Sequence, residues 1–467
     1  MTHSGERRGK AIATVVAVAA FAGAGVLLSS AAIAAPGDTI GPINPVAQPL
    51  GSHAANSGFL VFVEGDVELN ADEAEGTLAL GGDLSFQTSY NIAAGAVPPV
   101  TFIAPGDDRP TYLYVGGGVD FPASGVILKV LNNGFAKIAD TTTYDAFSVD
   151  QNNVAGPWHV VPPGGAYETQ PRIEGTITQT PTSIEAPVPG DLIDIAGAYS
   201  LYRDTTAALN RCAPTIEFAN RDDGAPLTPP YADGTNAKLT LVDGETNVVT
   251  VAASDLEAMS EIFFPLVPTL DTPLLVNVTG DTFSGQIPNL SNLTSGSAPF
   301  VLWNFPDATS VTVTGGATLE GSIYAPNADL NWQVTQNIEG NVIAKSFIHG
   351  LPAAPTPGTP REVHNFPFLA ELTCVEGGVP TTPPVTTTPP VTPTVEPTPT
   401  ADPTPTADPT PTVDPTPTDP ATVVPVPPNG DALPSTGVAS AAPLIGAAAL
   451  AAVGAAAIAI GYRRRRA

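Results

Sequence analysis

The stretch VTVTGGATLEGSIYAPNADLNWQVTQNIEGNVIAKSF, residues 311–347, holds the pattern that decides the fold. Glu320-Gly321 followed by Ser-Ile-Tyr-Ala recurs 19 residues later as Glu339-Gly340 followed by Asn-Val-Ile-Ala, and an echo occurs early at Glu75-Gly76. Short aliphatic runs at such a spacing, with glycine where the chain turns sharply, are typical of stacked coils that bury their aliphatic side chains on one another. The pattern predicts a mainly β fold built as a parallel β-solenoid. Because the clear copies are two, a β-sandwich stays open as the alternative.

Strand signals extend through residues 35–376, for example GFLVFVEGDVEL, EGTLALGGDLSF, TYLYVGGGVDF and LLVNVTG. The segment NAKLTLVDGETNVVTV predicts a hairpin with its turn at Asp243-Gly244. In contrast, residues 191–211 carry apolar or small side chains at intervals of three or four, which predicts one flanking helix. The members of this face are Leu192, Ile195, Tyr199, Tyr202, Thr206 and Leu209. A second, shorter helix is predicted within residues 254–263, with Ser254 as its N-cap.

Several of these segments, in this order, resemble a known family. The segments YLYVGGGV, IDIAGAYSLYRDTTAALN, VLWNFPDATSVTV, GSIYAPNADL, GNVIAKSF and REVHNFPF are similar to the choice-of-anchor A domain of exported bacterial proteins. The resemblance runs over most of residues 55–370. It implies an ice-binding-like β-solenoid with a flanking helix, which serves as an adhesive domain and brings no catalytic residues with it.

Both ends of the chain have the form of export signals. The N-terminus has a basic segment, an apolar stretch and small residues at Ala32 and Ala34, so residues 1–34 are predicted to be a signal peptide cleaved after Ala34. A retained N-terminal membrane helix is the alternative. At the other end, residues 438–460 form an apolar run long enough to span a bilayer of ~30 Å, followed by Arg463 to Arg466. This run is predicted to be a membrane helix whose basic tail stays in the cytoplasm.

A pentapeptide directly before this helix changes the meaning of the membrane segment. It consists of Leu433, Pro434, Ser435, Thr436 and Gly437, and it resembles the Leu-Pro-x-Thr-Gly motif of cell-wall sorting signals. In that family the order is motif, apolar span and basic tail, as in residues 433–467 here. The resemblance implies that a sortase cleaves after Thr436 and joins the chain to peptidoglycan. We therefore expect a secreted, wall-anchored protein that meets the membrane only transiently.

Between the domain and the motif, residues 377–432 are almost entirely Pro, Thr, Val and Asp. No apolar face is available to form a core, so we predict a disordered, extended stalk. Acidic residues six positions apart, at 396, 402, 408 and 414, resist its collapse, and dense proline favours polyproline II.

Charge and cysteine content limit the function further. Residues 36–436 hold 10 basic and 44 acidic residues, a net charge of −34, which excludes a nucleic-acid partner. The two cysteines of this exported chain, Cys212 and Cys374, predict a disulfide. Two buried thiols are the alternative.

Catalytic and metal-binding patterns are scarce. The sequence has no C-x-x-C or H-x-x-x-H pair, no G-x-S-x-G motif and no P-loop. The scattered histidines are interpreted as structural, with His364 in a packing or capping role. The doublets Asp107-Asp108 and Asp222-Asp223 are interpreted as solvated loop acids rather than a glycosidase pair. We expect no metal site; Ca²⁺ is the one ion that an acidic extracellular domain would suit.

Ice binding is not expected from the sequence either. Thr312 and Thr314 alternate in one strand, but Asn331 and Gln333 stand 19 residues later, so no threonine ladder forms there. The sequence predicts a non-enzymatic, wall-anchored adhesin for host, matrix or other cells, whose extracellular ligand, a glycan or a matrix protein, it does not identify. The alternatives are a surface enzyme that acts on polysaccharide and a structural coat protein.

Overall fold

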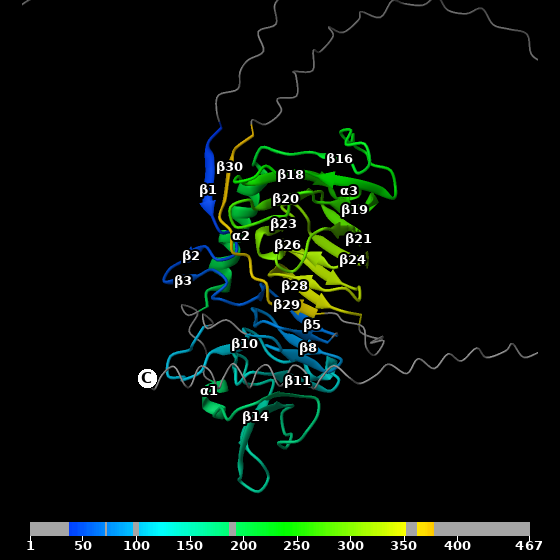
Figure 1. Cartoon of the computed structure of the whole chain (residues 1–467). Helices are drawn as coiled ribbons and strands as arrows, with labels where there is room; N and C mark the ends of the chain where they lie inside the picture. Colours follow the sequence, from blue (N-terminus) through cyan, green and yellow to red (C-terminus); the bar gives the residue numbers. More distant parts are fainter. Residues whose placement is uncertain (1–36, 71, 97–101, 186–192, 352–361, 378–467) are drawn as a thin grey trace, which may run out of the picture. The chain divides into compact units, whose positions relative to one another are not determined.

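The computed structural model describes residues 37–70, 72–96, 102–185, 193–351 and 362–377. All of them belong to the first of two compact units, residues 1–386. This part of the chain is mainly β with few helices, as the sequence predicts (Figure 1). The helices are α1 (Pro181–Glu185), α2 (Ile195–Asn210), α3 (Ala253–Ala258) and two 3₁₀ turns at Phe121–Ala123 and Ala298–Phe300.

The largest sheet has 13 strands, and every pairing within it is parallel. Its main path runs β12-β10-β7-β4-β28-β26-β23-β20-β18. Its strands are β4 (Val61–Val63), β5 (Val67–Leu69), β7 (Leu78–Leu80), β8 (Leu84–Phe86), β10 (Thr111–Val115), β12 (Phe135–Ile138), β18 (Asn247–Ala252), β20 (Leu274–Thr279), β21 (Thr282–Ile287), β23 (Val301–Asn304), β24 (Ser310–Gly316), β26 (Ser322–Trp332) and β28 (Val342–His349).

A second sheet has nine strands in the order β13-β14-β15-β11-β9-β6-β29-β27-β25. It contains β6 (Glu73–Ala74), β9 (Tyr90–Ile92), β11 (Ile127–Val130), β13 (Asp145–Val149), β14 (Ala155–Val161), β15 (Arg172–Gly175), β25 (Leu319–Glu320), β27 (Ile338–Glu339) and β29 (Glu362–His364). The smaller sheets are β16 (Phe218–Asn220), β17 (Thr235–Leu239), β19 (Met259–Phe263) and β22 (Asn289–Ser291); β1 (Thr39–Ile43) with β30 (Leu372–Val375); and β2 (Pro49–Leu50) with β3 (His53–Ala54).

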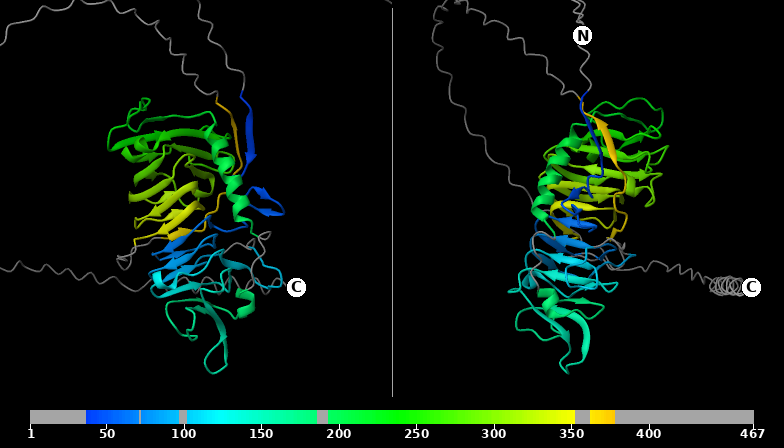
Figure 2. Two further views of the ribbon diagram at one scale, coloured as in Figure 1. Left: turned by 180° about the vertical axis from the view of Figure 1, so that it is seen from behind. Right: turned by 90° about the vertical axis from the view of Figure 1, so that its left-hand side faces the viewer.

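The order of the strands in space differs from their order in the chain. Strands β4, β7, β10 and β12 follow one another in one direction, whereas β18, β20, β23, β26 and β28 approach from the other end. The two series meet where β28 pairs with β4, so that Val342 lies beside Val61. Helix α2 lies between the two series in the chain, and its axis runs along the stack, across the direction of the strands (Figure 2). It reaches from the strands where the two series meet, which Tyr199 contacts, to β20, where the Leu209 carbonyl accepts a hydrogen bond from the Asn277 side chain.

The 19-residue spacing seen in the sequence is the register of neighbouring strands. Leu319 pairs with Ile338 and Ile323 with Val342, both in parallel. The early echo belongs to the same ladder, because Leu78 pairs with Val61, which in turn pairs with Val342. These aliphatic side chains are all buried, and they form the core between the sheets.

Gly321 is required where the chain turns from β25 into β26. Its φ is +127°, and an added Cβ would lie 2.9 Å from the Cβ and the carbonyl oxygen of Val301. The turn therefore needs both the conformational freedom and the small size of glycine. This explains why Glu-Gly recurs in the sequence.

Helix α2 packs through the face that the sequence predicts. Tyr199, Tyr202, Thr206 and Leu209 are buried, Ile195 is half-buried, and the predicted Leu192 lies outside the described residues. The Tyr199 hydroxyl lies 2.6 Å from the carbonyl oxygens of Phe62 and Ala344, which belong to the two strand series. The helix thus fastens both series at the point where they meet.

One prediction of local structure is wrong, and a second is right only in part. The strands around Asp243-Gly244 form no hairpin, because β17 pairs with β16 and β19 while β18 joins the 13-stranded sheet beside β20. The second helix, α3, ends at Ala258, and the following residues form β19. Ser254 does not cap it, since the N-cap position is Ala252, which makes no side-chain hydrogen bond.

At each end of the main path of the 13-stranded sheet, groups from outside the sheet hydrogen-bond to the backbone of one edge-strand residue. At the outer edge of β12, the buried Gln179 side chain accepts a hydrogen bond from the Ala136 N–H (2.9 Å) and donates one to the Ala136 carbonyl (2.8 Å). At the outer edge of β18, the N–H groups of Thr215 and Ile216 donate to the Val248 carbonyl. Side-chain and loop groups thus take the place of a further strand.

Cys212 and Cys374 form a disulfide, as predicted. It joins the residues just after α2 to β30, with a sequence separation of 162 residues.

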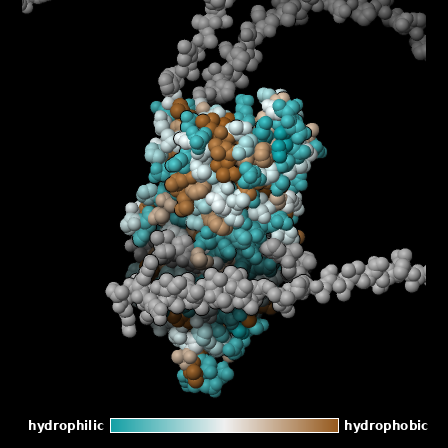
Figure 3. Space-filling model, viewed as in Figure 1, coloured by the Kyte–Doolittle hydropathy of each residue, from teal (hydrophilic) through white to brown (hydrophobic). Residues whose placement is uncertain are grey.

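The outer face over β21 and β24 is largely hydrophilic (Figure 3), and Thr282, Ser284 and Gln286 are exposed there.

Candidate functional site

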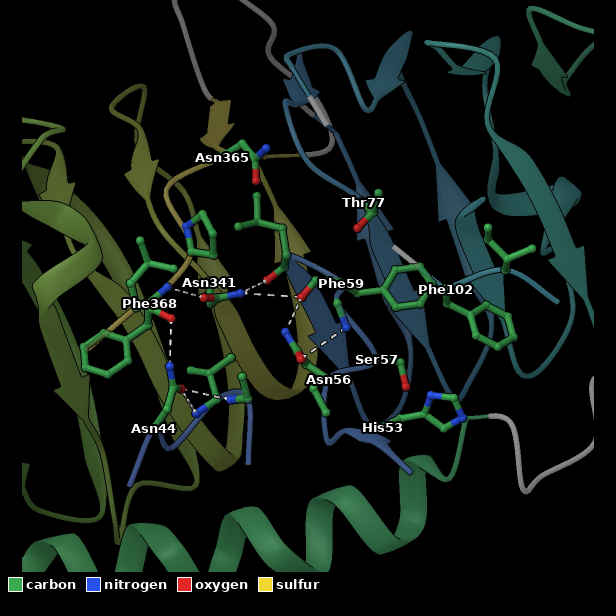
Figure 4. A pocket seen from close by; sticks show the side chains of 18 residues that line it. Asn44, His53, Asn56, Ser57, Phe59, Thr77, Phe102, Asn341, Asn365 and Phe368 are labelled. Atoms are coloured by element: carbon green, nitrogen blue, oxygen red, sulfur yellow. Dashed lines mark hydrogen bonds between the residues drawn. The ribbon is translucent and has the colours of Figure 1, made fainter. Parts of the chain in front are cut away.

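A pocket of about 600 Å³ lies where the N-terminal segment of the domain meets the segment that leads into β30 (Figure 4). Its walls come from residues 44–60, from the turns at Thr77 and Asn341, from residues 102 and 103, and from residues 365–369. Its volume falls within the range of about 300–1,000 Å³ that is usual for ligand pockets.

Asparagine side chains hold these segments together. Asn341 is fully buried, accepts a hydrogen bond from the Phe368 N–H (2.8 Å) and donates to the Leu60 carbonyl (3.0 Å). Asn44 donates to the Phe368 carbonyl (3.1 Å). Asn56 donates to the Phe59 carbonyl (2.8 Å). The amides are therefore engaged with the backbone, and they fix the shape of the pocket before any ligand arrives.

The walls between the asparagines are apolar. Phe59, Phe102 and Phe368 are buried and line the pocket, whereas Ile103 and Leu369 are 54% and 57% exposed at its rim. Two large apolar side chains left in solvent beside a preformed pocket mark a surface suited to a ligand.

Polar groups that remain available in the pocket are few. The side chains of His53, Ser57 and Thr77 line it, and no hydrogen bond joins them to another described residue. No Asp, Glu, Lys or Arg is among the described residues that line it. On a domain with so many acidic residues, this pocket is suited to an uncharged ligand that is mainly apolar and requires few hydrogen bonds.

A separate cluster of titratable groups lies on the nine-stranded sheet. Glu320, Glu339 and His364 occupy the same register position on β25, β27 and β29. His364 lies 2.8 Å from Glu339 through Nδ1 and 2.6 Å from Glu362 through Nε2. The hydrogen bond to Glu339, followed by the one to Glu362, raises the pKa of His364 to about 9, whereas burial opposes the rise. The imidazole is therefore held as a cation in an ion-pair network.

Glu320 behaves differently from the other carboxyl groups of this cluster. Burial raises its pKa to about 7, and the neighbouring Glu339 adds to the rise. Of the Glu339 carboxylate, Oε1 is paired with His364, while Oε2 is buried without a hydrogen bond to a described residue. Glu320 and Glu339 thus occupy paired positions on neighbouring strands.

A family model with the description "Putative Ice-binding-like adhesive domain" matches residues 52–353, well over half of the chain. The chain belongs to this family. A second model, the LPXTG cell wall anchor motif, matches residues 425–467. The protein is thus a cell-wall-anchored, extracellular surface protein with an adhesive-like domain, and its anchor motif implies sortase processing and attachment to peptidoglycan.

Solved structures of ice-binding proteins are among the similar ones. One, from an Antarctic biological consortium, has 10% identity and a TM-score of 0.21, covering 71% of this chain and 92% of the other. Another, from an Antarctic bacterium of the Flavobacteriaceae, has 11% identity and a TM-score of 0.22, covering 70% and 98%. No curated protein matches the chain significantly.

The ends of this ice-binding-like adhesin lie outside the described residues. This applies to the predicted cleavage site at Ala32 and Ala34, to the motif residues 433–437 and to the predicted membrane helix at 438–460. Within the described ranges, no helix is long and apolar enough to span a bilayer.

The predicted acidic doublets do not form an acid/base pair. Asp222 and Asp223 are exposed, as expected. The prediction of a solvated loop acid is wrong for Asp107, because its side chain is 7% exposed and lies 2.7 Å from the Lys137 ammonium group. This ion pair fastens the loop after Phe102 to β12.

The remaining predicted features are distributed over the adhesive domain. His349 is buried, and its Nδ1 lies 2.9 Å from the Tyr90 hydroxyl. Thr312 pairs with Asn331, the mixed column that the sequence indicated. Among the described residues, no three or more His, Cys, Asp or Glu side chains are grouped to hold a metal ion.

Sequence reasoning missed the pocket altogether. Its lining comes from five separate segments, and no single segment has a binding motif. One local signal was available: Asn341 follows the second Glu-Gly copy, where the first copy has Ser322. The exchange places a larger side chain with more hydrogen-bonding groups at the pocket wall, and the Asn341 N–H donates to the Ser322 hydroxyl (2.9 Å).

Proposed function

We propose that this protein is a non-enzymatic adhesin that presents a β-solenoid domain on a proline-rich stalk fixed to the cell wall. In this proposal residues 1–34 are a signal peptide, 35–376 the adhesive solenoid, 377–432 the extended stalk and 433–467 the sorting signal with its membrane helix at 438–460. The parallel ladders with a recurring 19-residue register support the solenoid, and the uncharged pocket supports the adhesive role.

Attachment would follow from the sorting motif. A sortase thiol attacks the Thr436 carbonyl carbon, the bond to the Gly437 nitrogen breaks, and an acyl-enzyme thioester forms. An amine of the wall precursor then displaces the thiol and forms an amide with Thr436. The membrane helix leaves with Gly437, so the mature domain stays on the wall.

The observation that carries the adhesive role is the preformed, uncharged pocket with Ile103 and Leu369 exposed at its rim. An array of glycans and matrix proteins, probed with the purified mature chain with and without a chelator, tests it. Binding that Leu369→Asp weakens would support the pocket as the adhesive contact. Binding that is unchanged in this variant would place the contact elsewhere, and no binding to any probe would contradict adhesion to these partners.

A surface enzyme that acts on polysaccharide is the second candidate. Glu320 and Glu339, at paired positions on neighbouring strands, favour this candidate. The pKa of Glu320 is raised, and Oε2 of Glu339 is buried without a hydrogen bond to a described residue. Incubation of the mature chain with polysaccharides distinguishes the two, because a hydrolase would release reducing ends and Glu339→Gln would abolish the release. An adhesin releases none.

A further inference from the structure

We propose that the apolar pocket binds the uncharged part of the stalk, residues 379–395, of a second copy of this chain. The proposal rests on the proposed adhesive role of the pocket and names its partner. The sequence VPTTPPVTTTPPVTPTV contains six prolines and no charged residue, whereas acidic residues recur from Glu396 onward. Copies on one wall, or on facing cells, would then hold one another.

The absence of charged side chains makes residues 379–395 the part of the stalk that suits the pocket. The part of the pocket lining that the structure describes contains no charged side chain, and the domain around it is strongly acidic. A segment with carboxylates would have to lose their hydration in the pocket and would meet repulsion around it. Residues 379–395 avoid both costs, but residues 396–416 do not.

Hydrogen bonding favours a proline-rich chain over a sugar. The amides of Asn44, Asn56 and Asn341 already bond to the backbone, so few groups are left to satisfy the several hydroxyls of a buried sugar ring. A polyproline II segment needs less, because proline has no N–H and offers ring surface and carbonyl oxygens. Aromatic-lined grooves are the usual receptors for such segments.

The available polar groups match that need. His53 and Ser57 lie on the pocket wall (Figure 4), and each can donate to a peptide carbonyl. The exposed side chains of Ile103 and Leu369 would cover proline and valine side chains of the bound segment.

The position of the stretch in the chain favours a neighbouring copy as the partner. Residues 379–395 follow closely on Gly377, the last residue that the structure describes. Because all copies would be fixed to the wall through stalks of the same length, the stretch next to each domain would be within reach of a neighbouring domain. The high local concentration on a wall makes even weak binding effective.

Two peptides from the chain itself form a matched test. Residues 379–395 and 396–412 each have 17 residues and six prolines, but the second peptide adds three carboxylates. In fluorescence anisotropy against the purified mature chain, residues 35–436, we expect the first peptide to bind at least tenfold more tightly than the second. Equal binding of the two, or no binding of the first at millimolar concentration, would overturn the proposal.

A second pair of variants locates the contact. Leu369 and Leu270 are both 57% exposed, but only Leu369 lines the pocket. Leu369→Asp should weaken binding of the first peptide roughly tenfold or more, and Leu270→Asp should leave it unchanged. An equal loss in both variants would show general surface adsorption and contradict the assignment.

Self-association of the mature chain tests the source of the segment. In sedimentation velocity, concentration-dependent association should disappear in a chain whose stalk carries Val385→Asp and Val391→Asp. Peptide binding without association would show that the stalk fills its own pocket, and it would contradict the second copy as partner. If the pocket binds an array ligand but neither peptide, the adhesive role stands and this inference fails.

Discussion

Glu339 and His364 face each other on neighbouring parallel strands, with Oε1 of Glu339 2.8 Å from Nδ1 of His364. The contact joins β27 to β29. Glu362 and Glu75 also act on the ring, and Glu320 stacks on the far side of Glu339. The domain therefore contains two groups with raised pKa values in one cluster, His364 at about 9 and Glu320 at about 7.

We expect the stability of the domain to fall as the pH rises from about 5 to about 9.5. The raised pKa of His364 stabilises the fold fully below its ordinary value of 6.5, and this contribution is lost as the pH rises through about 9. The raised pKa of Glu320 acts in the same direction, because its contribution is complete below 4.5 and lost as the pH rises through about 7. Urea unfolding midpoints at pH 5, 7 and 9.5 measure the effect.

His364→Gln provides the control for this prediction. It should flatten the fall between pH 7 and 9.5 and leave the fall between pH 5 and 7, to which Glu320 contributes. If the variant keeps the full wild-type slope above pH 7, the ion pair does not govern the pH response.

Loss of the disulfide should destabilise the domain by roughly 2–5 kcal/mol, because it closes a long loop between two buried cysteines. Thermal unfolding of the double variant Cys212→Ala and Cys374→Ala measures this change. Reduction of the disulfide in the unaltered chain should lower the melting temperature by about as much as the double substitution does. A melting temperature that neither treatment changes would mean that the bond has no part in stability.

Gly321→Ala should destabilise the fold by about 2–4 kcal/mol, because it combines a positive φ with a clash against Val301. Gly244→Ala is the matched control, since Gly244 also has a positive φ (+77°) but nothing lies within 4 Å of an added Cβ. It should cost only about 1 kcal/mol. Similar losses for both variants in urea unfolding would contradict the close approach at Gly321.

Thr436→Ala should abolish covalent attachment to the wall, since Thr436 supplies the carbonyl that the sortase attacks. Ser435→Ala should leave attachment intact, because Ser435 stands at the variable position of the motif. Release of the protein by a peptidoglycan hydrolase, compared with its release by detergent, distinguishes wall-linked from membrane-held chains. A Thr436→Ala chain that still requires the hydrolase would refute sortase anchoring at this residue.

Sequence reasoning succeeded where the signal was local. The Glu-Gly copies at Glu320 and Glu339 are neighbours in both sequence and space, so their spacing gave the strand register directly. The buried face of α2 repeats at every helical turn, so the sequence predicted it equally well. Local signals gave a wrong prediction at Asp243-Gly244, because the turn there connects strands of two different sheets and not the two strands of a hairpin.

Contacts between distant segments could not be predicted in this way. Val342 pairs with Val61, and nothing in either segment specifies the other, because parallel pairing depends on the path of the whole chain. Glu339 and His364 are 25 residues apart rather than 19, so the repeat does not align them. The pocket depends on the same long-range assembly, which is why its residues carried no recognisable motif.

The Gln179 amide at the edge of β12 has a consequence for crowded cell surfaces. Open strand edges on many identical molecules would join into fibrils, with each copy templating the next. The Gln179 side chain bonds to both the N–H and the carbonyl of Ala136, so these groups cannot pair with a strand of another molecule. At the opposite end of the sheet, the loop over Val248 occupies the Val248 carbonyl in the same way. Neighbouring molecules on a wall are therefore kept from pairing through these two strand edges, even where they stand close together.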